Sequence, residues 1–551
     1  MKNRLFKCIA LVLCTLLVIT AFAGCAKNGN EPTEPKGSTK TTGDDEKVPE
    51  NMNLTGMPIV KEPITLKIMV AKHVAQSDWS EMLVWKEYEK MTGVHVEWIE
   101  VPEQNQTLTE KRNLAVAGGD MPDAFFKCNF PAKDLQSYGE QEMFLKLNDM
   151  IDKYAPNFKK AIDEREDVAK GIQMVDGSIY SLPYIMNVLS PAITGKIFVN
   201  RKWLDKLEMD MPSTTEEFYN VLTAIKKTDL NGNGENDEIP LTSPAFNNVA
   251  SSLRGAWGLG NTGNANGFID AGAKDGKVRY WAADPNYKEQ LMYMNKLFDD
   301  ELLDEEIFQM NNNKLIGKAA QNQVGAFSAI NNNAMGQQYQ NDYEGLKAAL
   351  IGPSGDQLWS PVNSRIWDMG AFVITNVNKH PEITMRWVDY FYSEEGIKLY
   401  FMGKEGITYE VGADGKIDYN DEINKNPDGL TYDQAIGKYL AWGGKGNPSM
   451  AIDEYFRGAA VLPIPLEAAN RLKPYLPEEI WPVFSYTSEE NEERAELEAD
   501  LNGYVNEMTA QFVTGKKPFA EWDNYVNELK KMGLDDYLQI CQTAYERYKG
   551  N

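Results

Sequence analysis

Strands and helices alternate at the start of the folded part of the sequence, and this order constrains the fold more than any other feature. Residues 64–70 alternate apolar and polar side chains and then become fully apolar, which predicts a core strand. Apolar side chains three residues apart predict a helix that follows and ends at Gly93. A second strand is expected over 94–101, a helix over 107–116 and a third strand over 123–126. This order predicts a mostly parallel sheet in an α/β layer fold.

The same alternation returns further along the chain. Residues 197–199 are typical of a strand, and the segment 212–217 places Ser and Thr before Glu at the spacing of a capping box, which predicts a helix N-terminus. Apolar runs predict two buried strands over 323–327 and 370–375. The region after Glu489 is predicted to be helical, with its acidic stretch on a solvated face.

The N-terminus has the pattern of a secretory signal. Lys2, Arg4 and Lys7 precede an uncharged apolar run over 9–23, and small residues lead to Cys25. The run is short for a transmembrane helix, and an uncleaved N-terminal anchor is the alternative. Small residues before Cys match the lipobox of bacterial lipoproteins, so residues 1–24 are predicted to be a lipoprotein signal peptide. Cys25 would then carry a diacylglycerol and an acyl chain, which is enough for stable anchoring.

Residues 25–57 are predicted to be the lipidated cysteine and a flexible tether. The segment consists mainly of Pro, Gly, Thr and charged residues, so it cannot bury enough apolar surface to offset its ordering entropy. After this segment the chain retains Cys128 and Cys541, which predicts no disulfide framework.

Composition narrows the classes of function. The chain has 56 Lys and Arg against 81 Asp and Glu, a formal net charge of −25. A nucleic-acid partner would need a basic surface that replaces phosphate counterions, so no nucleic acid is expected. Histidine occurs three times, so a His-rich metal site or a cluster of His general bases is not expected.

The segment 229–238 has the spacing of metal ligands. Asp229, Asn231 and Asn233 fall at positions one, three and five, with Gly at position six, as in the first half of an EF-hand calcium loop. Position twelve, which is Glu in an EF-hand, is Pro240, so the loop is not an EF-hand. The spacing predicts a structural calcium site, and an Asn- and Gly-rich turn without an ion is the alternative. The predicted ligands are Asp229, Asn231, Asn233, the backbone carbonyl of Glu235, Asp237 and Glu238.

Several segments together resemble a known protein family. They include residues 198–207, the segment 212–218 that leads to the metal loop, and the runs 119–123 and 176–184. These stretches are similar to the extracellular solute-binding proteins of carbohydrate ABC importers, in particular to their LipO-like and alginate-oligosaccharide-binding branch. The resemblance spans about residues 64–548. In that branch the loop equivalent to the metal loop binds calcium.

The resemblance implies a two-lobe periplasmic-binding-protein-like fold of type II. Members have two α/β lobes joined by crossing segments, and the lobes close on a sugar in the cleft by a hinge motion. From the strand pattern the first lobe is expected over 58–190 plus 325–375, and the second over 191–324 plus 376–551.

Sugar contacts are predicted from chemistry and position. Aromatic rings can stack on the C–H faces of sugars, while carboxylates and guanidinium groups bind their hydroxyls. Trp257 stands in a Gly-rich loop, and Trp442 lies where the alginate-binding relatives place a stacking Trp. Packing in the core is the alternative for any one aromatic. The predicted contacts are Trp257, Trp442, Trp367, Asp368, Asp120, Asp123, Tyr184 and Arg254.

The resulting expectation is a lipid-anchored binding protein, not an enzyme, that captures an oligosaccharide and delivers it to the permease subunits of an ABC transporter. It is expected to be an exported monomer, held by lipid on the outer face of the cytoplasmic membrane of a Gram-positive cell. A secreted glycoside hydrolase or lyase is one alternative, although no carboxylate pair stands out by its spacing. A lipoprotein that binds peptides or other solutes on the same scaffold is another.

Overall fold

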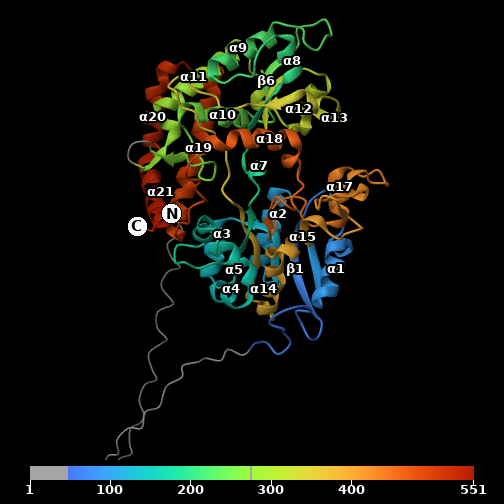
Figure 1. Ribbon diagram of the computed structural model, residues 1–551. Coiled ribbons are helices and arrows are strands. Elements are labelled where there is room, and N and C mark those ends of the chain that lie inside the picture. Colours follow the sequence, from blue (N-terminus) through green and yellow to red (C-terminus); the bar gives the residue numbers. More distant parts are fainter. Residues whose placement is uncertain (1–47, 273–275, 551) are drawn as a thin grey trace, which may run out of the picture. The chain divides into compact units, whose positions relative to one another are not determined.

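Two β-sheets organise the chain: the first has a hydrophobic core on each of its sides, and the second packs in a third core (Figure 1). The computed structural model describes residues 48–272 and 276–550. Pro49–Asn551 forms one compact unit. The predicted signal peptide, Cys25 and most of the predicted tether lie outside the described residues. Within the described ranges, no helix has both the length and the apolar character needed to cross a bilayer.

The first sheet has six strands, and all but one point in the same direction. In spatial order they are β14 (Met450–Ala451), β4 (Leu182–Met186), β11 (Ile366–Ile374), β3 (Ala124–Phe130), β1 (Ile64–Lys72) and β2 (Val94–Pro102). β1 pairs in parallel with β2 and β3, and β14 with β4, whereas β11 runs antiparallel to β3 and β4. The predicted α/β class and the strand–helix order at the start of the body are confirmed.

Helices and loops packed on this sheet complete what we call the first lobe. Ile68 and Val70 of β1 face one core, and Met69 and Ala71 face another on the opposite side of the sheet, which explains the fully apolar end of this strand. The other elements of the first lobe are α1 (Leu83–Thr92), α2 (Asn105–Ala117), α3 (Ala132–Glu140), α4 (Asn148–Tyr154), α5 (Pro156–Asp163), α6 (Glu166–Gly171), α14 (Pro381–Asp389), α15 (Glu394–Met402), β12 (Tyr409–Val411), β13 (Ile417–Tyr419), α16 (Asp421–Asn424) and α17 (Tyr432–Tyr439).

The second sheet has four strands and forms the second lobe with the helices around it. In spatial order the strands are β10 (Tyr343–Gly345), β5 (Lys196–Asn200), β9 (Val324–Ala329) and β6 (Ile239–Thr242). β6 runs parallel to β9, and β5 runs antiparallel to β9 and β10. The other elements are α8 (Arg201–Lys206), α9 (Thr215–Lys226), α10 (Phe246–Arg254), β7 (Ile269–Ala271), β8 (Val278–Tyr280), α11 (Pro285–Asp299), α12 (Asn312–Ala320), α13 (Gly336–Tyr339), α18 (Pro463–Leu472), α19 (Ser488–Val513), α20 (Trp522–Lys531) and α21 (Leu534–Lys549).

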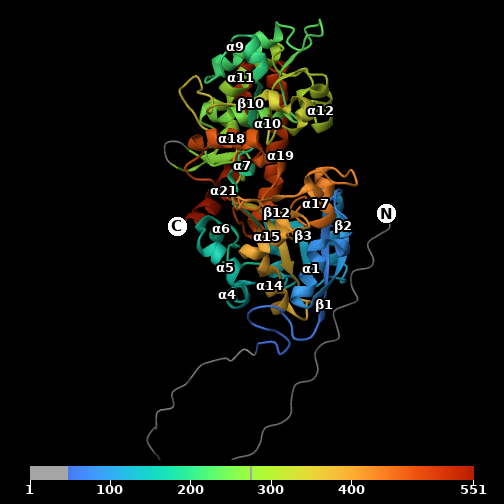
Figure 2. The ribbon, with the colours of Figure 1, turned by 45° about the vertical axis from the view of Figure 1, so that its right-hand side comes forward.

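The helix start and the C-terminal helices that the sequence predicts are present in the second lobe. α9 begins at a capping box in which Thr214 and Glu217 bond each other's backbone N–H groups. Of the C-terminal helices, which are drawn in red in Figures 1 and 2, α19 packs against α11, and α20 and α21 pack against α19. Tyr287 of α11 and Thr509 of α19 share a hydrogen bond of 2.7 Å between their hydroxyls. The end of the chain therefore packs into the core of the second lobe.

The strand pairing divides the chain differently from the expected lobe boundaries. The segment 325–375 was expected in the first lobe, but β9 at its start pairs with β5 and β6 of the second sheet. The segment 376–551 was expected in the second lobe, but residues up to Phe456 pack in the core of the first. The physical reason is that an apolar run predicts burial without indicating which sheet will bury it.

Within the described residues the chain crosses between the two sheets three times, and the crossing segments are bonded to one another. They follow β4, precede β11 and follow β14. The amide of Thr194 donates to the carbonyl of Pro361 at 2.8 Å, and that of Asn363 donates to the carbonyl of Ala192 at 2.9 Å. The Ser190 hydroxyl donates to the carbonyl of Ala460 in the third crossing. These segments form the junction of the two lobes.

Candidate functional site

Strand directions place several loops at one edge of the first sheet. β1, β2, β3 and β4 all end at this edge, and β11 begins there. The amide of Met186, at the end of β4, donates to the carbonyl of Arg365 at 2.8 Å, so the edge adjoins the crossing segments. Ligands of open α/β sheets bind outside the carboxyl ends of the strands. We call this edge the carboxyl edge of the first lobe.

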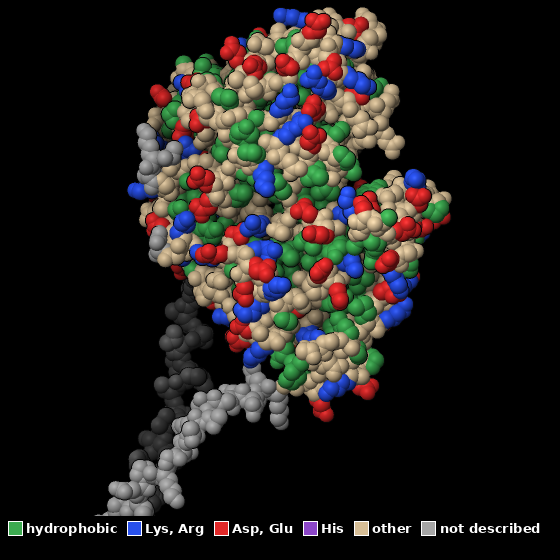
Figure 3. Space-filling model, viewed as in Figure 1, with side chains coloured by type: hydrophobic (Ala, Val, Ile, Leu, Met, Phe, Trp, Pro, Cys, Tyr) green, Lys and Arg blue, Asp and Glu red, His purple; other side chains and the backbone are tan. Residues whose placement is uncertain are grey.

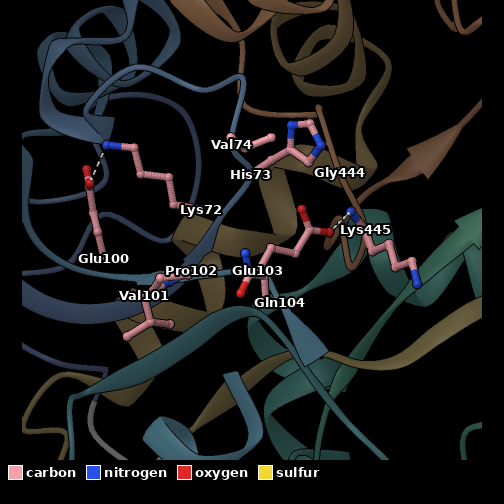
Figure 4. A pocket seen from close by; sticks show the side chains of 10 residues that line it. All are labelled: Lys72, His73, Val74, Glu100, Val101, Pro102, Glu103, Gln104, Gly444 and Lys445. Atoms are coloured by element: carbon pink, nitrogen blue, oxygen red, sulfur yellow. Dashed lines mark hydrogen bonds and ion pairs between the residues drawn. The ribbon is translucent and has the colours of Figure 1, made fainter. Parts of the chain in front are cut away.

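An open cavity of about 930 Å³ lies at this edge, which is within the usual size range of small-molecule sites. Figure 3 shows the surface hollowed beside α17, the helix that leads into the loop lining the cavity. Positive and negative side chains are interspersed over the face drawn there. Figure 4 shows the lining residues, which are Lys72, His73, Val74, Glu100, Val101, Pro102, Glu103, Gln104, Gly444 and Lys445.

One wall of the cavity carries a network of paired charges. The ammonium of Lys72 donates to Asp78 at 2.5 Å and to Glu100 at 2.6 Å. Burial opposes the charge of this lysine, but the two carboxylates outweigh burial and raise the pKa of Lys72. The lysine is therefore a charged and already paired group at the end of β1.

The opposite wall is a glycine loop, residues 443–446, which is fastened to the strand ends by a buried lysine. Lys127 of β3 donates to the carbonyl of Gly443 at 2.5 Å, to the carbonyl of Ala441 at 3.1 Å and to Oδ1 of Asn447 at 2.9 Å. Burial lowers the pKa of Lys127 to about 8. The backbone of Lys127 has a positive φ of 59°, a conformation that costs energy for a non-glycine residue.

Two carboxylates also accept hydrogen bonds from backbone amides of the glycine loop. The amide of Lys445 donates to Oε1 of Glu103 at 2.6 Å, and the amide of Gly446 donates to Oδ2 of Asp368 at 2.8 Å. Burial raises the pKa of Asp368 to about 6. Asn129 presses against Gly446, where a side chain on the loop would collide with its Oδ1. The loop therefore needs glycine for close approach to the strand ends.

Four of the predicted sugar contacts gather at this edge. Asp368 stands opposite Tyr184 in the pairing of β11 with β4, and the rings of Tyr184 and Trp367 meet edge to face at 5.9 Å. Trp367 is half-buried. Trp442 is also half-buried, directly precedes the glycine loop and donates through Nε1 to the hydroxyl of Tyr419 at 3.0 Å. These four residues lie at the carboxyl edge of the first lobe, but none of them is among the residues that line the cavity, and Tyr184 is only 3% exposed.

Two other predicted contacts lie at the opposite edge of the same sheet. Asp120 and Asp123 precede β3, so they stand at its amino end, whereas the cavity is at the carboxyl ends. Oδ2 of Asp123 accepts a hydrogen bond of 2.7 Å from the amide of Lys67 in β1. Asp123 thus ties the amino end of β3 to β1, whereas the exposed side chain of Asp120 lies 3.8 Å from the ammonium of Lys67. Both aspartates stand at the end of β3 that points away from the cavity.

The remaining two predicted contacts are buried in the second lobe. Trp257 is 5% exposed and packs against Tyr293 at a ring distance of 5.3 Å. The guanidinium of Arg254 donates to the Ser360 hydroxyl at 3.0 Å and to Oδ1 of Asn264 at 2.9 Å. Burial lowers the pKa of Arg254 to about 10. Both side chains have the environment of structural residues.

Sequence reasoning missed the polar groups that hold the glycine loop. Glu103, Lys127 and Asn129 carry no local motif, because their partners lie hundreds of residues away. The one available signal was the Gly-rich run after Trp442, which indicates a loop that approaches other backbone closely.

The predicted metal loop folds round its own side chains. The two oxygens of Asp229 accept hydrogen bonds from the amides of Gly232 and Gly234 at 2.7 and 2.9 Å. Both glycines have positive φ, 79° and 90°, which lets the chain turn tightly. Oδ1 of Asp237 accepts from the side-chain amides of Asn231 and Asn233 at 2.8 and 3.0 Å. The pKa of Asp237 is lowered, and the largest contribution comes from the hydrogen bond that the side chain of Gln323 donates to it.

Glu238 provides a test of whether the loop fits a cation. It is buried, and its Oε1 accepts from the amides of Leu230 and Asn231 at 2.6 and 3.0 Å. Its other oxygen, Oε2, is buried without a hydrogen-bond partner among the described residues. An orphaned buried carboxylate oxygen beside hard oxygen donors fits Ca²⁺. No cluster of three or more His, Cys, Asp and Glu in metal-binding arrangement occurs in the described part of the chain, and the amide oxygens of two asparagines would have to complete this site.

Comparison with known proteins gives one family. The sequence model of the bacterial extracellular solute-binding proteins matches residues 72–398. A fructooligosaccharide ABC transporter substrate-binding protein of Streptococcus pneumoniae, FusA, is 30% identical over 582 residues and covers 100% of both chains. Lipoprotein LipO of Bacillus subtilis is 23% identical over 376 residues, 66% of this chain and 70% of its own.

Solved structures agree with the sequence comparison. FusA in complex with kestose has a TM-score of 0.71 at 31% identity, covering 89% of this chain and 100% of that chain. An EF-hand mutant of FusA in complex with fructo-nystose has a TM-score of 0.70 at the same identity and coverage. The alginate-binding protein AlgQ2, solved without calcium, has a TM-score of 0.68 at 22% identity, over 90% of this chain and 99% of that chain. The predicted resemblance and the two-lobe fold are confirmed: the chain belongs to the bacterial extracellular solute-binding proteins.

Proposed function

We propose that this chain captures an oligosaccharide between its lobes and delivers it to the permease of an ABC importer. The observation that carries the proposal is the cavity at the carboxyl edge of the first lobe, in a member of a solute-binding family. Its wall is pre-organised by Lys127, Glu103 and Asp368, so that little ordering remains when a ligand binds. Half-buried Trp367 and Trp442 at the same edge would offer ring surface to a sugar, and the carboxylates of Glu103 and Asp368 would accept hydrogen bonds from its hydroxyls.

The ligand to test first is a fructooligosaccharide, because that class is named for the relative that is 30% identical over the whole chain. Titration calorimetry of the purified chain with kestose and nystose measures binding directly. A tight, saturable heat signal supports the proposal. A chain that binds neither these sugars nor members of a wider oligosaccharide panel contradicts it.

The same incubation separates binding from catalysis. FusA is named as a substrate-binding protein, and we infer that this chain likewise releases its ligand unchanged. Recovery of the sugar at its original length supports binding. Time-dependent release of shorter products would favour the glycoside hydrolase or lyase alternative, and preferential binding of peptides would favour the other-solute alternative.

We propose that the metal loop binds a structural calcium ion through Asp229, Asn231, Asn233, the carbonyl of Glu235, Asp237 and Glu238. The partnerless Oε2 of Glu238 supports this proposal. The names of two structural neighbours, an EF-hand mutant and a form without calcium, point to calcium in those proteins. When bound, the ion would supply charge neutralisation for three carboxylates, which holds the loop closed.

We propose that the chain is exported and anchored by lipid at Cys25, as a monomer on the outer face of the cytoplasmic membrane. The support is the sequence pattern of residues 1–25 together with an extracellular family. Replacing Cys25 by Ser should move the protein from the membrane fraction to the medium, because the lipid anchor is lost. Replacing Cys14, a cysteine within the signal, is the matched control and should leave it in the membrane fraction.

A further inference from the structure

The second lobe presents an edge to the crossing segments that corresponds to the carboxyl edge of the first. Lys196, at the start of β5, donates to the carbonyls of Ser190 and Ile193 in a crossing segment at 2.8 and 2.7 Å. The same ammonium donates to the carbonyl of Ile330, directly after β9, at 2.9 Å. Because β6 runs parallel to β9, both strands end at this edge. We call it the carboxyl edge of the second lobe.

Two phenylalanines stand at this edge. Phe246 begins α10, a few residues after the end of β6. Phe308 follows a segment that runs beside β6: Leu303 pairs in parallel with Leu241, and the Thr242 hydroxyl donates to Asp304 at 2.7 Å. The direction of that segment carries Phe308 past the end of β6. Both rings therefore belong to the same edge as the ends of β6 and β9.

The rings of Phe246 and Phe308 are stacked on each other, and Phe308 is the exposed one. Their centroids are 4.5 Å apart and their planes are 22° from parallel. Phe246 is 8% exposed, whereas Phe308 is 37% exposed. The buried ring thus backs the outer ring and fixes its orientation, and Phe308 keeps apolar surface in contact with solvent.

We propose that Phe308, backed by Phe246, is a stacking platform for a sugar ring on the second lobe. The chemistry that fits is the C–H face of a neutral sugar ring, since a flat, fixed aromatic surface offers contact area at small cost in ordering entropy. The first lobe contributes the complementary groups, the carboxylates Glu103 and Asp368 and the paired Lys72. A sugar bound between the lobes would have hydroxyls toward the first and a C–H face toward Phe308. This inference depends on the proposed oligosaccharide-binding function.

The test compares substitutions at Phe308 by calorimetry with kestose, or with the oligosaccharide of the panel that the unmodified chain binds most tightly. We expect Phe308→Ala and Phe308→Leu to weaken binding about 10-fold, because a stacked ring is lost. Phe308→Tyr and Phe308→Trp should keep the affinity within about 3-fold, since each retains an aromatic face. Met292→Ala, which removes another exposed hydrophobic side chain of the second lobe, is the matched control and should bind as the unmodified chain does.

The outcomes separate this inference from the proposed function. If the unmodified chain binds sugar and Phe308→Ala binds equally well, the platform is wrong while the function stands. Full affinity in Phe308→Leu also overturns the inference, because hydrophobic contact without a ring would then be sufficient. If the unmodified chain binds no oligosaccharide, the proposed function and the platform fail together. Melting curves of all variants check that a loss of affinity comes from folded protein.

Discussion

The metal loop and the carboxyl edge of the first lobe are built in opposite ways. In the loop, all the predicted ligands lie within residues 229–238, and two glycines with positive φ fold the chain round them. At the edge, the polar groups come from β1, β2 and the residue after it, β3, β11 and the glycine loop, and Lys127 is separated from its acceptor Gly443 by 316 residues. One site is local in sequence, and the other exists only after the chain has folded.

This difference decides which side chains sequence spacing can assign. In the loop, turn chemistry at Asp229, Gly232 and Gly234 fixes the positions of neighbouring oxygens mainly from within the segment, although Gln323 outside it also donates to Asp237 at 2.7 Å. At the edge, the burial and pairing of each side chain depend on which strands become neighbours. Mutations should therefore act locally in the loop but affect stability and binding together at the edge.

The sharpest test of this contrast uses two tryptophans that have similar sequence surroundings. Trp257 and Trp442 each precede glycine, but Trp257 is buried in the core of the second lobe and Trp442 is half-buried beside the glycine loop. Trp257→Ala should lower the free energy of unfolding by about 3–5 kcal/mol, because it leaves a large cavity. Trp442→Ala should destabilise less and weaken sugar binding more. Denaturant unfolding and calorimetry measure both, and equal effects of the two variants on affinity would contradict the assignment.

The next largest effect is expected from Asp368, whose pKa burial raises to about 6 from an ordinary value of 3.8. In the folded state the carboxyl group of Asp368 keeps its proton up to about pH 6. Protonated Asp368 therefore stabilises the fold fully below pH 3.8, and this stabilisation is lost as the pH rises through 6. The two-unit shift corresponds to about 3 kcal/mol. Asp368→Asn should remove that dependence, so the variant gains stability relative to the unmodified chain at pH 7.5 and not at pH 4. Denaturant unfolding at the two pH values measures the free energy of unfolding of the variant and of the unmodified chain.

Asp389 is the matched control for this prediction. Burial also raises its pKa to about 6, but it accepts hydrogen bonds from Phe158 and Asn157 of α5 rather than from the glycine loop. Asp389→Asn should remove a similar pH dependence of stability and leave sugar affinity unchanged, whereas Asp368→Asn should weaken it. A loss of affinity in both variants would mean that binding follows general stability and not the carboxyl edge.

A smaller effect on stability is expected from Lys127→Met. The substitution leaves the carbonyl of Gly443 without its buried donor, at a cost of about 1–3 kcal/mol. Sugar affinity should fall as well, because the glycine loop loses its attachment. Lys445→Met changes an exposed lysine of the same loop and should leave the free energy of unfolding unchanged. A Lys127→Met variant with normal stability and affinity would show that the loop is held without the lysine.

The fold could be predicted wherever the pattern is local. The spacing around Gly93 predicted the helix between β1 and β2, and the capping box predicted the start of α9. The lobe membership of β9 could not be predicted, because its apolar side chains would suit either sheet. Backbone strain at Lys127 was equally invisible, since nothing in its neighbourhood indicates a positive φ.

For the same reason, only the edge on which some of the predicted contacts lie could be predicted. Trp367, Asp368 and Tyr184 lie at the carboxyl edge of the first lobe because each stands near an end of a buried strand, although none of them lines the cavity, and their contact with sugar stays a prediction. Asp120 and Asp123 also flank a strand, but at the end that points away from the cavity. Sequence spacing places a residue at a strand end, and only the strand order decides which end faces the ligand.

The smallest expected effect concerns the metal loop, the site that is local in sequence. Calcium at ten times its Kd should stabilise the chain by about 1.4 kcal/mol, and EDTA should remove this gain. Asp237→Ala should abolish the difference between melting curves in calcium and in EDTA, because the loop loses a carboxylate. Asp210→Ala, an exposed acid of the same lobe, should preserve it. Identical melting temperatures of the unmodified chain in calcium and EDTA would make the loop an Asn- and Gly-rich turn. The orphaned Oε2 of Glu238 would then need a water molecule as its partner.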